Sequence, residues 1–265
     1  MIKIFKRELI ANLKSLFFWS IGMFLMSSIG FIEYSAIAGS GEGINSIFNM
    51  MPRVALVMFG AGTLPLSSPE GYYACMFLWL AVIAFAHAIL LGASIVSKEE
   101  SDKTSEFLFT KPINRKNIVT AKILVSIINM AVLAFVAWGS TVAFFLPRVE
   151  GVNLLKEVDL TMLGMFITQI VFFFIGIFIS GILKDNRKGS LYGAAVLLIT
   201  YFISVFIEMS GKVDFLNFLS PFRYFNAVSV MDKGLEPLYL VISAIIVAVT
   251  GFFSYIFWEK RDLNN

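Results

Sequence analysis

Six long apolar stretches constrain this chain more than any other feature of its sequence. Each has about 20 residues or more, the length that a helix needs to cross a hydrocarbon core about 30 Å thick. Only 15% of the 265 residues are charged, against about 25% in an average soluble domain. The sequence therefore predicts an all-α polytopic membrane protein, with residues 1–265 as a single six-span domain. The spans are expected near residues 16–38, 72–96, 118–146, 160–183, 190–209 and 237–258.

The distribution of Lys and Arg predicts how these spans are oriented. Fifteen of the 21 basic residues lie in or beside the two termini and the segments that follow the second and fourth spans, and six lie elsewhere. Cytoplasmic segments of membrane proteins carry the excess of Lys and Arg. We therefore expect a multi-pass protein of the cytoplasmic (inner) membrane with both termini in the cytoplasm.

Three segments outside the spans have patterns of their own. Residues 2–17 place apolar side chains on one face and most Lys and Arg on others, which predicts an interfacial helix leading into the first span. Residues 45–60 and 212–226 are apolar but too short to span. Backbone groups in hydrocarbon must be paired within the segment, so we expect two helical elements that insert partway into the outer leaflet.

The segment after the second span predicts a short cytoplasmic helix. Ser97 and Glu100 have the spacing of a capping box, in which the hydroxyl and the carboxylate satisfy backbone N–H groups at a helix start. Pro112 cannot continue a helix, and Asn114 is a suitable N-cap for the next one. The pattern predicts a helix over 98–110, a tight turn, and the third long helix.

Several kinds of chemistry are not indicated. No glycine-rich loop ending in Gly-Lys-Ser/Thr occurs, so we expect no nucleotide site in this chain. The chain has one His and one Cys, so we expect no metal site and no other cofactor. Without a nucleotide site of its own, it is not expected to be an enzyme. No sequence pattern indicates a nucleic-acid partner.

Three ionisable residues in or near spans bear on whether the chain is an ion-coupled carrier. Ion-coupled carriers keep charged groups near the middle of the bilayer. Glu33 and Glu208 are expected near the outer ends of spans, which favours an interfacial position. His87 is expected within the second span as a neutral side chain hydrogen-bonded to a neighbouring helix. An ion-coupled secondary transporter and a membrane anchor or assembly factor remain the alternative interpretations.

The loop after the second span carries an ordered pattern of acidic, apolar and basic residues. They are Glu99, Glu100, Thr104, Glu106, Leu108, Pro112, Arg115 and Lys122. This pattern resembles the first cytoplasmic loop of the permease subunits of type-2 family ATP-binding-cassette (ABC) exporters. The resemblance departs at Lys103, where that family commonly has Gly. Weaker matches at residues 6–9, 68–72, 219–222 and 261–263 extend it over nearly the whole chain.

The resemblance implies a permease subunit that exports an unidentified substrate. ATP and Mg would be bound by a separate dimer of ABC ATPase subunits, and a second permease copy or paralogue would complete the transporter. The 28 Phe and 12 Met residues suit a hydrophobic or amphipathic substrate, although packing against lipid explains the same counts. The resemblance and the place of these residues in and beside the predicted helix give the residues expected to couple to the ATPase. They are Glu99, Glu100, Lys103, Thr104, Glu106, Phe107, Leu108, Pro112 and Arg115.

Overall fold

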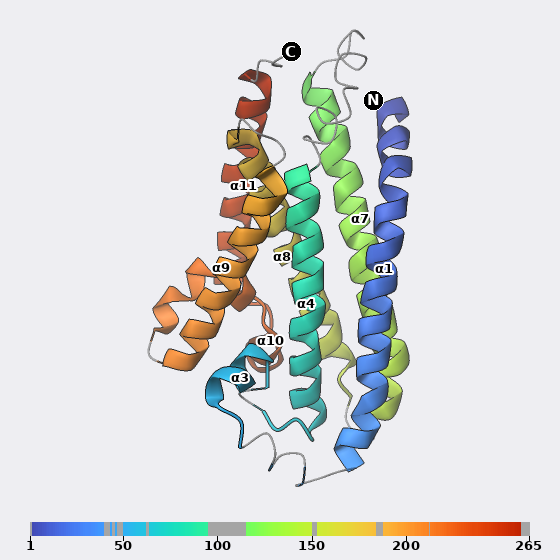
Figure 1. The fold of residues 1–265 in the computed structure, drawn as a ribbon, viewed down its shortest axis with the longest axis vertical. Coiled ribbons are helices and arrows are strands. Elements are labelled where there is room, and N and C mark those ends of the chain that lie inside the picture. The colour runs from blue at the N-terminus through green and yellow to red at the C-terminus, as the bar shows by residue number, and fades with distance from the viewer. Residues whose placement is uncertain are drawn as a thin grey trace.

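Six long helices form one bundle in the computed structural model, which describes residues 2–39, 43, 46, 50–61, 64–94, 115–149, 153–183, 188–211 and 213–260. The helices run side by side along the long axis of the molecule (Figure 1). All six are long and apolar enough to cross a membrane. Their bounds lie close to the predicted spans, which confirms the all-α polytopic fold. They are α1 (Ile2–Gly39), α4 (Pro69–Ser94), α7 (Arg115–Phe144), α8 (Leu155–Ile182), α9 (Gly189–Ser210) and α11 (Pro237–Lys260).

The start of α1 and the end of α11 lie at the same end of the bundle (Figure 1). We call this end the inner end, because the distribution of basic residues predicts it to be cytoplasmic, and the opposite end the outer end. Short helices lie at the outer end. They are α3 (Arg53–Met58), η1 (Leu146–Arg148), η3 (Asp214–Leu219), η4 (Pro221–Arg223) and α10 (Ala227–Lys233).

Helix ends follow local signals in the sequence. Pro69 and Pro237 begin α4 and α11, where the missing N–H of proline costs no helical hydrogen bond. Gly211 ends α9 in the left-handed conformation, with φ +57°, which residues with a Cβ atom rarely adopt. Asn226 caps α10, since its Oδ1 accepts a hydrogen bond of 2.9 Å from the N–H of Ser229.

The N-terminal segment is part of the first spanning helix. The predicted interfacial helix over 2–17 and the predicted first span form one continuous α1. Near its start, Ile4 packs into a small buried cluster with Ile118 and Ala121 of α7. This end of α1 therefore lies along α7 (Figure 1), while Leu13 and Phe17 remain exposed on its outside.

The two predicted outer elements have helical turns where the structure describes them. Helix α3 falls within 45–60, and η3 and η4 fall within 212–226. The hydroxyl of Tyr201 on α9 donates a hydrogen bond to the carbonyl of Met58, which joins the end of α3 to the bundle. The depth of these elements in a bilayer stays a prediction.

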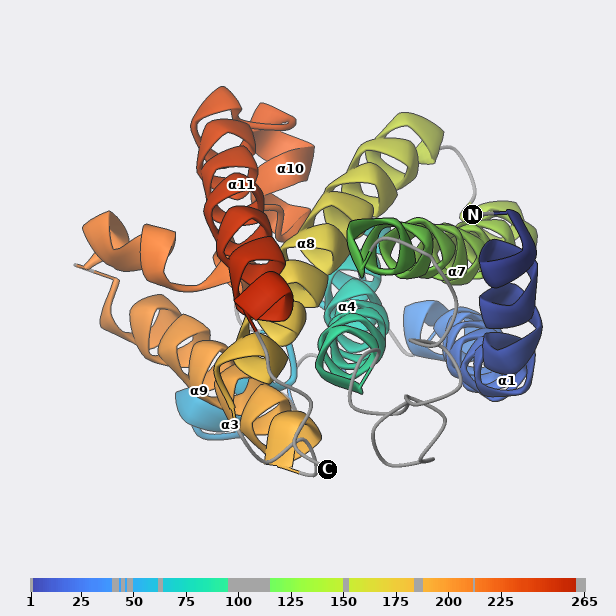
Figure 2. The same ribbon diagram turned by 90° about the horizontal axis from the view of Figure 1, so that it is seen from above.

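Helices α4 and α8 pack against each other most extensively and form the centre of the core. Their inner halves approach through glycines: a Cβ atom on Gly92 would overlap the carbonyl oxygen of Phe173, and one on Gly176 would overlap that of Ile89. Gly189 at the start of α9 lies close to the carbonyl of Ala93 in the same region. We call Gly92, Gly176 and Gly189 the inner glycine contact. Figure 2 shows α4, α8 and α9 from the end, with α8 between α11 and α4.

Candidate functional site

The predicted coupling segment is bounded by two helix ends. Helix α4 ends at Ser94 and α7 begins at Arg115, both at the inner end of the bundle (Figure 1). Arg115 is therefore the first residue of a spanning helix. The remaining predicted coupling residues lie outside the described part of the chain: Glu99, Glu100, Lys103, Thr104, Glu106, Phe107, Leu108 and Pro112.

A buried ion pair joins α1 to α7 close to this segment. The Nζ of Lys122 lies 3.4 Å from Oε2 of Glu8, and Nη2 of Arg7 lies 3.0 Å from Oε1 of the same carboxylate. Lys122 is 3% exposed and Glu8 is 7% exposed, so the pair is largely shielded from water. The sequence marked Lys122 only through the family resemblance. Glu8, an acidic residue within a basic segment, was the available signal for a partner.

Removing the lysine should destabilise the bundle. In Lys122→Met the Glu8 carboxylate stays buried, and its remaining ionic partner among the described residues is the half-exposed Arg7. We therefore expect a loss of about 2 kcal/mol in the free energy of unfolding. For a chain of this size, that lowers the thermal midpoint by about 4–8 °C, measurable by size-exclusion thermostability in detergent.

Lys233→Met is the matched control for this variant. Lys233 pairs with Glu236 at 3.8 Å, but its side chain is 64% exposed. An exposed pair is worth about 0–1 kcal/mol, so its loss should shift the midpoint little. Equal midpoints for the two variants would show that the Glu8–Lys122 pair does not hold α1 against α7.

His87 and Glu33 occupy different surroundings. The His87 ring is 3% exposed and packs edge-on against Trp19 of α1, with ring centroids 5.4 Å apart. Among the described residues its Nδ1 has no hydrogen-bond partner, so the predicted bond to a neighbouring helix is replaced by this ring contact. Glu33 is exposed near the outer end of α1, as an interfacial side chain would be.

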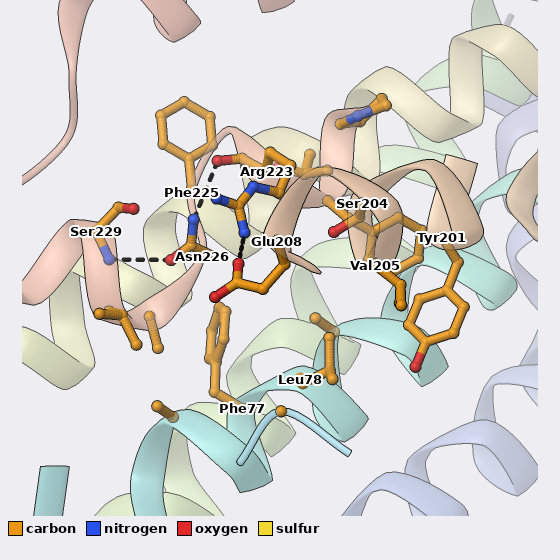
Figure 3. A pocket seen from close by; sticks show the side chains of 18 of the residues that line it. Phe77, Leu78, Tyr201, Ser204, Val205, Glu208, Arg223, Phe225, Asn226 and Ser229 are labelled. Atoms are coloured by element: carbon orange, nitrogen blue, oxygen red, sulfur yellow. Dashed lines mark hydrogen bonds and ion pairs between the residues drawn. The ribbon is translucent and has the colours of Figure 1, made fainter. Parts of the chain in front are cut away.

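One cavity of the described structure lies toward the outer end, and we call it the outer pocket. Its volume is about 220 Å³. Helices α4 and α9 form two of its walls, and the segment 221–229 forms a third. Val57 and Gly60, in and beside α3, and Thr168 of α8 complete the lining. Figure 3 shows this arrangement.

Aromatic rings make up much of the apolar lining. Phe85 of α4 meets Phe222 of η4 edge-to-face, with ring centroids 5.1 Å apart. Tyr201 of α9 contacts the same Phe222 ring at 5.5 Å. Phe77 projects from α4 toward the pocket (Figure 3). The inserted Phe222 therefore ties the outer segment to both walls of the pocket.

Hydrogen bonds hold the segment around Phe222 in place. The Ser220 hydroxyl donates to the carbonyl of Thr200 on α9 at 2.7 Å. The Tyr224 hydroxyl donates to the carbonyl of Phe218 at 2.6 Å and closes the turn between η3 and α10. Burial raises the pKa of Tyr224 to about 12, so this hydroxyl keeps its proton at neutral pH.

One ion pair supplies the charged part of the outer pocket. Glu208 in the last turn of α9 pairs with Arg223 of η4. The Nε of Arg223 also donates to Oδ1 of Asn217 at 3.2 Å. Burial lowers the pKa of Arg223, yet a guanidinium remains charged at any physiological pH. Glu208 thus lies near the outer end of its span, as expected, but in a partnership that was not predicted from the sequence.

The described residues contain no group of His, Cys, Asp and Glu side chains that could hold a metal ion. What the outer pocket offers is an apolar, aromatic cavity with one carboxylate and one guanidinium at its edge. Such a cavity can bind an organic molecule that has both apolar and charged parts.

Comparison with protein families gives a match over nearly the entire chain. The model of a family described as "ABC-2 family transporter protein" matches residues 2–263. No curated protein matches the chain.

Proposed function

Because this chain belongs to the ABC-2 family of transporter proteins, we propose that it is the permease subunit of an exporter driven by ATP hydrolysis in separate ABC ATPase subunits. The single observation that carries this proposal is the family match over residues 2–263, which agrees with the six apolar spans. In such a transporter the permease forms the membrane pathway, and the ATPase supplies the energy.

The proposed assembly contains two permease chains and two ATPase subunits. The second permease is a further copy of this chain or a paralogue. Both termini and the segment between α4 and α7 face the cytoplasm, as the excess of Lys and Arg favours. This segment docks on the ATPase through the helix predicted over 98–110.

The position of the Glu8–Lys122 pair supports a mechanical role for the docking segment. The pair lies within the first turns of α7 and links that helix to α1. A displacement of the docking segment at the start of α7 is then shared by two spanning helices. Discrete shifts of packed helices are a common way to pass movement from one site to another.

An ion-coupled carrier is less well supported by the described residues. Such a carrier uses an ionisable group near the bilayer midplane. Glu33 and Glu208 both lie at outer ends of helices, and Glu208 is neutralised by Arg223. We therefore assign no coupling role to either carboxylate.

The proposal is tested by coexpressing the tagged chain with an ABC ATPase from its own genome, sought first in the neighbouring reading frame. The pair should co-purify, and the complex in lipid nanodiscs should hydrolyse ATP. The same complex with the catalytic glutamate of the ATPase replaced by glutamine is the control for background hydrolysis. Solute uptake driven by a proton or sodium gradient, in liposomes that hold this chain alone, would contradict the proposal and favour a carrier.

A further inference from the structure

Both charged groups of the outer pocket keep unused binding capacity. Arg223 bonds to Glu208 through Nη1 and to Asn217 through Nε, and within the described chain no partner is found for its Nη2. Glu208 uses Oε2 for Arg223, and no described residue bonds to its Oε1. In Figure 3 the second carboxylate oxygen points away from Arg223, toward the side where the Phe77 ring projects from α4. Each group can therefore bind a ligand without giving up its present partner.

The pairing of the two charges selects the charge type of a ligand. The carboxylate and the guanidinium lie side by side, so the net charge of the site is zero. A ligand with a single charge meets one attractive and one repulsive group at similar distances. A zwitterion placed antiparallel to the ion pair meets two attractive groups, and its anion accepts charge-assisted hydrogen bonds from the guanidinium.

The aromatic lining selects the rest of the ligand. Aromatic faces attract quaternary ammonium groups and also bury methylene groups. Phe77, Phe85, Phe222 and Tyr201 supply such faces. A volume of about 220 Å³ is below the range of about 300–1,000 Å³ of sites for drug-sized molecules. The cavity thus suits a headgroup and the first methylenes of a chain, with the remainder of the chain outside it.

We propose that the outer pocket binds a zwitterionic amphiphile of the phosphocholine type. The ammonium lies beside Glu208 and Phe77, the phosphate lies beside Arg223, and the adjoining methylenes lie against the pocket side of Phe85 and Phe222. As the class of cargo, this assignment rests on the proposed export function. As a binding site, it stands on the pocket alone.

The test uses hexylphosphocholine, a probe soluble as a monomer, titrated onto the purified chain in nanodiscs without ATPase and measured by calorimetry. Glu208→Gln and Arg223→Gln should each weaken binding tenfold or more. Glu236→Gln is the matched control, because it removes a carboxylate from the outer end that pairs with Lys233 outside the pocket. It should bind as the wild type does.

Ser204→Leu separates binding from the stability of the ion pair. Ser204 lines the pocket on α9 (Figure 3), so the larger leucine side chain fills part of the cavity. The ion pair between Glu208 and Arg223 stays intact. We expect the same loss of binding of tenfold or more, with monodisperse elution retained. Wild-type affinity in this variant would overturn the location of the site.

Three analogues test the assigned class. Hexyltrimethylammonium has only the cation, hexyl phosphate has only the anion, and glycerophosphocholine has no alkyl chain. Each should bind at least tenfold more weakly than hexylphosphocholine. Equal binding by any of them would overturn the assignment of a zwitterionic amphiphile. No ATPase is present in this experiment, so neither result decides whether the chain takes part in ATP-driven transport.

Discussion

Gly176→Ala is expected to lower the free energy of unfolding of the bundle by about 3 kcal/mol, near the upper end of the cost of overpacking. The added methyl group would overlap the carbonyl oxygen of Ile89 and approach the backbone nitrogen of Ala93 at 2.9 Å. Both obstacles are backbone atoms of α4, so no side chain can rotate away. The two helices must separate instead. The thermal midpoint in detergent should fall by about 6–12 °C.

Gly139→Ala is the control for this substitution. Gly139 also lies within a spanning helix, α7, but a Cβ atom there meets nothing within 4 Å. Its midpoint should stay unchanged or rise, because alanine favours a helix over glycine by about 1 kcal/mol. The double variant Gly92→Ala, Gly176→Ala should lower the free energy of unfolding by less than the sum of the two single losses. One separation of the helices relieves both overlaps. Equal midpoints for Gly176→Ala and Gly139→Ala would contradict the close approach of α4 and α8.

The double variant Phe107→Ala, Leu108→Ala is expected to abolish recovery of the ATPase. Under the proposed function these side chains fill an apolar pocket of the ATPase. Truncating a buried interface anchor costs about 2–4 kcal/mol. At about 1.4 kcal/mol per factor of ten, the double variant should bind the ATPase at least about 30-fold more weakly. Co-purification in detergent and ATP hydrolysis by the complex should fall together.

Two further substitutions in the segment make the result specific. Lys98→Ala should be nearly silent, because a charge at the rim of an interface contributes far less than a buried anchor. Lys103→Gly should be tolerated, since it restores the residue common in the family. Wild-type recovery of the ATPase by the double variant, with the fold checked by monodisperse elution, would remove residues 98–110 from the interface.

The spans were predictable because their signal is local and strong. A membrane helix must satisfy its backbone within about 20 apolar residues. The apolar stretches at 72–96 and 237–258 therefore located the helices Pro69–Ser94 and Pro237–Lys260 to within a few residues. The continuity of α1 was harder to see. The basic face of residues 2–17 suggested a helix at the membrane surface, but Ile4 and Glu8 face α7 and extend the spanning helix.

The outer pocket could not be derived from the sequence in the same way. Glu208 and Arg223 are 15 residues apart, and their meeting depends on the reversal at Gly211 and the anchoring of Ser220 to α9. The insertion of Phe222 against Phe85 joins residues far apart in the chain. Such contacts depend on how helices pack, and the pattern of apolar residues within one helix carries little information about them.

The inner glycine contact is a close approach of helix backbones near the inner end, about which the helices could tilt. Ala74, at the outer pocket, lies 18 residues from Gly92 along α4, which is about 27 Å at 1.5 Å per residue. A tilt of about 10° between α4 and α9 around the contact would displace their outer ends by about 5 Å over that length. The same tilt would hardly separate the backbones at the glycines. A small change of angle at the inner end would therefore produce a larger displacement where the aromatic walls meet.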